Sequence, residues 1–195
     1  MMLSTVHTGR TLAVVSLGFG AGPASAHAPG AHVHGEAQAS VVVADTALSI
    51  TVNSAMYNIT GFERAPQSPE EEARLAEAIA ALEDGDTLFE ANPAAGCALS
   101  SAVHSLPETA GETQPGPGGD DHDEDNPYRD LEATYEFTCA SPEQLETIRF
   151  AFIERFENLE KVDVVLFVND VLFVNDQQSA QALSHDTLTL ALPDR

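Results

Sequence analysis

Residues 32–53 read HVHGEAQASVVVADTALSITVN, and small or apolar residues recur there at every second position. In the first run they are Val33, Ala37, Ala39, Val41 and Val43, and in the second they are Leu48, Ile50 and Val52. This period is typical of strands with one buried face, because side chains on a strand point to opposite sides in turn. The stretch therefore predicts a β-hairpin that turns at Ala44-Asp45-Thr46.

Two later segments carry the signature of a helix start. Ser68-Pro69-Glu70-Glu71 is a capping box with proline at the first helical position, and apolar residues follow it at helical spacing up to Gly85. Ser141-Pro142-Glu143-Gln144 repeats the pattern. The apolar residues after this second box are Leu145, Ile148, Phe152, Phe156 and Leu159. We therefore predict two amphipathic helices.

Residues 1–26 have the parts of a secretory signal peptide. Arg10 precedes an apolar stretch from Leu12 to Ala21, and Ala24-Ser25-Ala26 forms a cleavage site. The apolar stretch is too short to cross a bilayer, which takes roughly 20 apolar residues. Cleavage after Ala26 would make His27 the first residue. We expect Sec export to a bacterial periplasm, with secretion beyond it as the alternative.

The chain has two cysteines, Cys97 and Cys139. An oxidising compartment favours one disulfide between them, and their spacing does not fit a C-x-x-C zinc or redox motif. The alternating runs that contain them flank a Pro-, Gly- and acid-rich stretch at 107–129, which predicts a hairpin with a long loop. If the two cysteines face each other directly, the antiparallel register places His104 opposite Glu132.

Two further strands are expected at residues 162–168 and 187–192. A tandem VLFVND at 165–176 predicts a lengthened strand or loop. From residue 48 the predicted order is β-α-β-β-α-β, with an extra strand at each end. This order predicts an α+β fold with a ferredoxin-like core, in which an antiparallel sheet carries two helices on one face. We expect residues 27–195 to form a single domain with a flexible acidic loop at 107–129.

The 195-residue chain carries 31 Asp and Glu against 8 Lys and Arg, a formal charge of −23. This surplus leaves no basic patch for phosphates or an anionic membrane surface, which excludes nucleic-acid binding as a function. Cations are the natural partners of such a surface. Adaptation to high salt, or simple solubility, accounts for the same charge.

Three histidines cluster at the start of the exported chain: His27, His32 and His34. A strand through residues 32–34 would place His32 and His34 on one face, with Glu36 next along it. Zinc binds neutral imidazole and carboxylate ligands, and His27 could add its ring and its α-amine. The cluster predicts a zinc site, and the alternative is a solvated tail that binds metal adventitiously.

A second candidate site lies in the long loop, where residues 120–125 place five acids around His122. Hard cations such as calcium prefer these oxygens, which makes Asp121 and Asp123 candidate ligands. Counted from Asp121, acids occupy positions 1, 3, 5 and 12 of an EF-hand-like loop ending at Glu132, but the sixth position lacks glycine. A disordered acidic loop is the alternative.

Four segments together resemble a known family, in order along the chain. They are AHVHGEA at 31–37, GFERAP at 61–66, AAGC at 94–97 and YEFTC at 135–139. They resemble the ZrgA-type family of zinc-regulated periplasmic proteins of Gram-negative bacteria. The resemblance implies a zinc-binding accessory of periplasmic zinc uptake, which works beside an ABC importer and its solute-binding protein.

This chain departs from the family pattern at two places. Arg64, which cannot ligate zinc, stands where the family has a second histidine, and the loop holds acids and His122 where relatives carry many histidines. The resemblance therefore carries over best to His32 and His34. We expect zinc affinity below that of the family pattern, or a loop that gathers cations less selectively.

No G-x-S-x-G, H-E-x-x-H or Gly-rich phosphate motif occurs in the chain, so we expect a binding protein rather than an enzyme. The leading hypothesis is a periplasmic protein that buffers or delivers zinc. Two others stay open: a calcium-responsive acidic module that uses residues 120–132, and an envelope protein-interaction module whose histidines are incidental.

Overall fold

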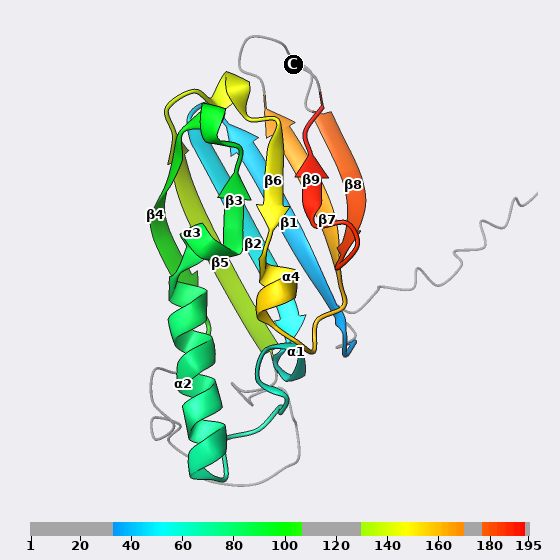
Figure 1. The fold of residues 1–195 in the computed structure, drawn as a ribbon. Helices are drawn as coiled ribbons and strands as arrows, with labels where there is room; N and C mark the ends of the chain where they lie inside the picture. Colours follow the sequence, from blue (N-terminus) through cyan, green and yellow to red (C-terminus); the bar gives the residue numbers. More distant parts are fainter. Residues whose placement is uncertain (1–32, 107–129, 170–176, 194–195) are drawn as a thin grey trace, which may run out of the picture. The chain divides into compact units, whose positions relative to one another are not determined.

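The structure, a computed structural model, describes residues 33–106, 130–169 and 177–193 (Figure 1). The predicted signal peptide, the 107–129 loop and the whole second VLFVND copy at 171–176 lie outside these residues. The elements are β1 (Glu36–Ala44), β2 (Ala47–Ala55), α1 (Met56–Thr60), α2 (Pro69–Glu83), α3 (Gly85–Leu88), β3 (Phe89–Ala91), η1 (Pro93–Ala95), β4 (Cys97–His104), β5 (Asp130–Cys139), η3 (Pro142–Gln144), β6 (Thr147–Phe150), α4 (Phe152–Arg155), β7 (Lys161–Asn169), β8 (Gln177–Ser184) and β9 (Thr189–Ala191).

A six-stranded sheet in the order β4-β5-β2-β1-β7-β8 forms the larger layer (Figure 1). The predicted hairpin is confirmed as β1 and β2, the two central strands, which turn at Asp45 with a φ of 51°. Neighbouring strands are antiparallel except β1 and β7, which run parallel. The alternating residues of the hairpin from Ala37 to Val52 are buried, as their pattern predicts.

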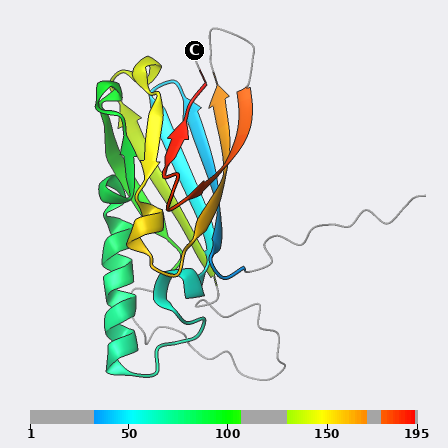
Figure 2. The same cartoon turned by 45° about the vertical axis from the view of Figure 1, so that its right-hand side comes forward.

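The smaller sheet, in the order β3-β6-β9, covers one face of the larger one (Figure 2). Aromatic rings fill the space between the two layers. The ring of Phe89 on β3 lies 4.9 Å from Tyr135 on β5 and 5.1 Å from Phe150 on β6, measured between centroids. Burial of these apolar side chains is therefore the main force that holds the two layers together.

The first predicted helix is confirmed as α2. The Ser68 hydroxyl accepts a hydrogen bond from the Glu71 N–H at 3.2 Å, and Pro69 occupies the first helical position. Leu75 and Leu82 face the core and are almost fully buried. None of the helices in the described part of the chain has the length and apolarity needed to cross a membrane.

The second predicted helix is wrong. Its capping box forms only η3, a single turn without a side-chain cap, and the chain then enters β6 and the short α4. Ile148, Phe150 and Phe152 are spaced by two, whereas Ile148, Phe152 and Phe156 are spaced by four, so both periods fit the same segment. Strand pairing decides between them, because β6 has β3 on one side and β9 on the other.

The ferredoxin-like topology is therefore not formed. The fold is α+β with a mostly antiparallel sheet, but α2 is the only long helix among the described residues, and β6 takes the place expected for a second one. The strand expected at 162–168 is confirmed as β7, whereas the one at 187–192 is the short β9 of the smaller sheet. β3 and β8 were not predicted.

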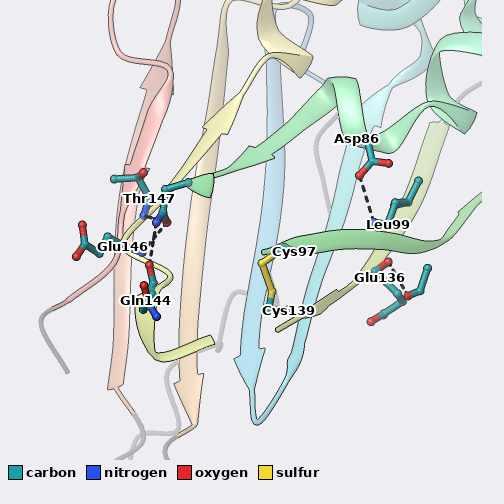
Figure 3. The surroundings of a disulfide bond; sticks show 10 residues. Asp86, Cys97, Leu99, Glu136, Cys139, Gln144, Glu146 and Thr147 are labelled. Carbon is teal, nitrogen blue, oxygen red and sulfur yellow. Dashed lines mark hydrogen bonds between the residues drawn. A yellow bond between two sulfur atoms is a disulfide. The ribbon is translucent and has the colours of Figure 1, made fainter. Parts of the chain in front are cut away.

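The disulfide between Cys97 and Cys139 is confirmed, and it joins directly opposed residues of β4 and β5 (Figure 3). The predicted register holds from Cys97 to Leu99 and then shifts by one residue at a β-bulge. His104 therefore pairs with Ala133 rather than with Glu132. Bulges are common in edge strands such as β4, where they interrupt the free edge.

Tyr135 and Gly85 generate a paired prediction about stability. The Tyr135 hydroxyl is buried and has no hydrogen-bond partner within the described residues, and burial raises the pKa of its phenol. We expect Tyr135→Phe to raise the free energy of unfolding by about 1 kcal/mol, because it removes an unpaired buried group. A Cβ at Gly85 would lie 2.6 Å from the Tyr135 ring. Gly85→Ala should therefore lower the free energy of unfolding by about 1–3 kcal/mol.

Urea unfolding of the two single variants and the parent measures both effects. A Tyr135→Phe variant that is less stable than the parent would contradict the first expectation. Unchanged stability in Gly85→Ala would contradict the second.

Candidate metal centre

The chain enters β1 through a tight turn that carries His34. The Glu36 N–H donates to the Val33 carbonyl at 3.1 Å and closes the turn. Gly35 has a φ of +85°, which favours glycine, and its carbonyl accepts from the Glu160 N–H at 2.8 Å. Residues 33 and 34 are therefore not part of a strand as predicted, since β1 begins only at Glu36, and His32 lies outside the described residues.

Asn58 on α1 holds this turn from inside the protein, where its side chain is fully buried. Its Oδ1 accepts from the Gly35 N–H at 2.7 Å. Its Nδ2 donates to the Glu36 carbonyl at 2.9 Å and to the Ser54 hydroxyl at 3.0 Å, and it lies 3.4 Å from the Val33 carbonyl. Both ends of one amide are thus used to fix the backbone on either side of His34.

The His34 ring packs on the side chain of Tyr57, which precedes Asn58 on α1. It stacks on Tyr57 with centroids 4.0 Å apart and an angle of 14° between the planes. Its Nε2 lies 3.1 Å from Oε1 of Glu63, in the loop after α1. The two side chains keep 52% and 32% of their surface accessible, so this polar pair faces solvent while its backbone is anchored in the core.

An imidazole nitrogen beside a carboxylate oxygen is half of a tetrahedral zinc site. No set of three or more His, Cys, Asp or Glu side chains placed to hold a metal occurs in residues 33–106, 130–169 and 177–193, so the pair does not become a complete site within this part of the chain. Glu36 does not join them. It contacts Nζ of Lys161 at 3.3 Å, and the same ammonium lies 3.1 Å from Asp163.

The remaining predicted ligands fall outside the described residues. They are His27, His32, Asp121, His122 and Asp123. Strand pairing nevertheless fixes where their segments attach to the sheet. Ser54 pairs with Ala37 beside the His34 turn, and Ala55 pairs with Asp130, the first residue after the acidic loop. Both segments therefore begin or end at the sheet end that carries His34.

Glu63 was not among the ligands predicted from the sequence, although it lies in the GFERAP segment. It is 29 residues from His34, and only the packing of α1 against the β1 turn brings the two together. Its neighbour Arg64 binds Glu71 on α2 with two hydrogen bonds of 2.7 and 2.8 Å. Arg64, followed by the Gln67 N–H, lowers the pKa of the Glu71 carboxyl to about 2.

Asn58 generates a prediction about this turn. We expect Asn58→Ala to lower the free energy of unfolding by about 2–3 kcal/mol, because it leaves the buried Gly35 N–H and its neighbours without partners. Asn53 on β2 is exposed and forms no hydrogen bond through its side chain within the described residues, so Asn53→Ala is the matched control. Equal stability of the two variants in urea would contradict the role of Asn58.

Comparison with known proteins shows the family of this chain. No curated protein matches the chain. The family model for the ZrgA family zinc uptake protein matches residues 31–192, which include the His34 turn, Glu63 and both cysteines. The chain therefore belongs to the ZrgA family of zinc uptake proteins.

Proposed function

We propose that this protein binds zinc at His34 and Glu63 and buffers or delivers the ion in the periplasm, as an accessory to a zinc ABC importer. The observation that carries the proposal is the 3.1 Å approach of the His34 imidazole to the Glu63 carboxylate. Membership of a zinc uptake family supports zinc as the ion.

Zinc needs about four ligands, so His34 and Glu63 require partners. We propose that these come from His27 and His32, directly before the turn, and from Asp121, His122 and Asp123. The attachment of both segments at one end of the sheet supports this assignment. Glu36 would have to leave Lys161 to take part, so we give it no primary role.

The exposure of the His34–Glu63 pair supports exchange rather than storage. An enclosed four-ligand site holds zinc as a structural ion, whereas an open site keeps positions for other ligands. The negative surface would raise the local concentration of divalent cations around such a site. A protein of this kind would gather zinc and pass it on, and the proposal includes no catalytic step.

Export is part of the proposal. The Cys97–Cys139 disulfide supports an oxidising compartment, because disulfides are rare in reducing ones. The signal-like residues 1–26 support the same route. The mass of the protein purified from the periplasmic fraction would test cleavage after Ala26.

Calorimetric titration of metal-free protein with zinc tests the site. We expect zinc affinity to fall about tenfold or more in His34→Ala and in Glu63→Gln, and further in His32→Ala/His34→Ala, because each change removes a ligand. Binding should weaken as the pH is lowered from about 7.5 to about 5.5, because protons compete with zinc for imidazole nitrogens.

His185→Gln is the matched control, since the His185 ring contacts the Leu159 carbonyl and lies on the β8–β9 connection. It should bind zinc as the parent does. Unchanged affinity in both His34→Ala and Glu63→Gln would overturn the site. A parent that binds calcium but not zinc would overturn the function.

A further inference from the structure

A cavity of about 580 Å³ opens where α1, α2 and the segment after α4 meet. This volume lies in the usual range for sites that bind small molecules. Tyr57 lines the cavity and also stacks on His34, so the cavity lies beside the candidate metal centre. His34 and Glu63 themselves do not line it. Its charged residues are Arg74 and Glu77 on α2, Arg155 at the end of α4, and Glu157 just after it.

Arg74 differs from the other basic residues in its ion pairing. The described part of the chain holds five Lys and Arg side chains, and four of them form ion pairs with acids. Arg74 forms no ion pair there, although Glu71 and Glu77 lie one helical turn away on either side, and after Arg64 and the Gln67 N–H its charge also helps to lower the pKa of the Glu71 carboxyl. Glu71 is occupied by Arg64 and the Gln67 N–H, and Glu77 accepts from Arg155 at 3.1 Å.

A second donor converges with Arg74 on the same space. A Cβ built on Gly61 would lie 3.6 Å from Nδ2 of Asn158 and 4.0 Å from Nη1 of Arg74. Gly61 has a φ of +86°, so glycine is favoured there and this space stays open. Asn158 Nδ2 donates one hydrogen to the Tyr57 carbonyl and keeps a second. The space beside Gly61 therefore faces two N–H donors.

The other charges of the cavity narrow the class of ligand. Arg155 and Glu77 neutralise each other, which leaves Arg74 and the carboxylate of Glu157. Glu157 forms no ion pair within the described residues. A multiply charged anion such as phosphate would meet this carboxylate and a chain of charge −23. A ligand with one carboxylate and one ammonium group matches both residues, and Ile59, Ala78 and Phe156 supply apolar walls.

We propose that this cavity binds a free α-amino acid, with the ligand carboxylate at Arg74 and Asn158 and the ligand ammonium at Glu157. A guanidinium suits a planar carboxylate, because its fork can donate two parallel hydrogen bonds. The proposal involves no metal and does not depend on the zinc function. It assigns a role to Gly61, Arg74 and Asn158, which the metal centre does not use.

The experiment uses metal-free protein, so that chelation of zinc by the ligand plays no part. Ligand-observed NMR with a mixture of the twenty common L-amino acids identifies the strongest binder, and calorimetry then measures its affinity. We expect Arg74→Gln to weaken binding about tenfold or more, since a hydrogen-bonded charge pair is lost. N-acetylation or methyl esterification of the ligand should have a similar effect, because each removes one charge.

Arg149→Gln is the matched control, since Arg149 forms ion pairs with Glu90 and Glu154 and none of these three residues lines the cavity. It should bind as the parent does. Arg74 is exposed and has no ion pair to lose within the described residues, so Arg74→Gln should melt close to the parent. Three results would overturn the proposal: no amino acid binding at about 10 mM, full affinity in Arg74→Gln, or equal binding of the N-acetylated ligand.

Discussion

The buried amide of Asn58 fixes the corner where the central strands of the fold meet. It bonds the backbone at the start of β1 and the Ser54 hydroxyl near the end of β2, while the Gly35 carbonyl beside it accepts from the first residues of β7. Three strands of the large sheet are thus joined by one side chain and one turn. The His34 ring stacks on Tyr57, the residue before Asn58 on α1. The same short helix therefore holds both the strand corner and the candidate metal centre.

The parts of the fold that could be predicted from the sequence are those in which one local pattern dominates. The β1–β2 hairpin has an unambiguous period of two, α2 has a capping box with a single apolar stripe, and two cysteines leave one pairing. The segment from Ser141 to Leu159 fits both periods, and the neighbours of β6 decide between them. Those neighbours include β3, which is only three residues long and has no pattern of its own.

The candidate site shows the same division. His34 is a candidate from the sequence because histidines cluster near it, but the sequence predicts a strand where the structure has a turn. The HVHG segment alternates correctly, and the preference of Gly35 for positive φ breaks the strand before it starts. Glu63 could not be deduced from spacing, since its distance from His34 depends on how α1 packs against the β1 turn.

The charge of −23 and the two side chains of the candidate metal centre would contribute differently to the proposed cation binding. A diffuse negative surface attracts every divalent cation, and salt screens this attraction beyond about 8 Å at physiological ionic strength. Carboxylates alone suit hard cations such as calcium, whereas imidazole favours zinc and other transition metals. In the proposed function, selectivity for zinc would therefore come from histidines in direct contact with the ion. His34 has the geometry for this contact, because it lies beside a carboxylate, on a supporting ring and on a backbone that cannot move freely.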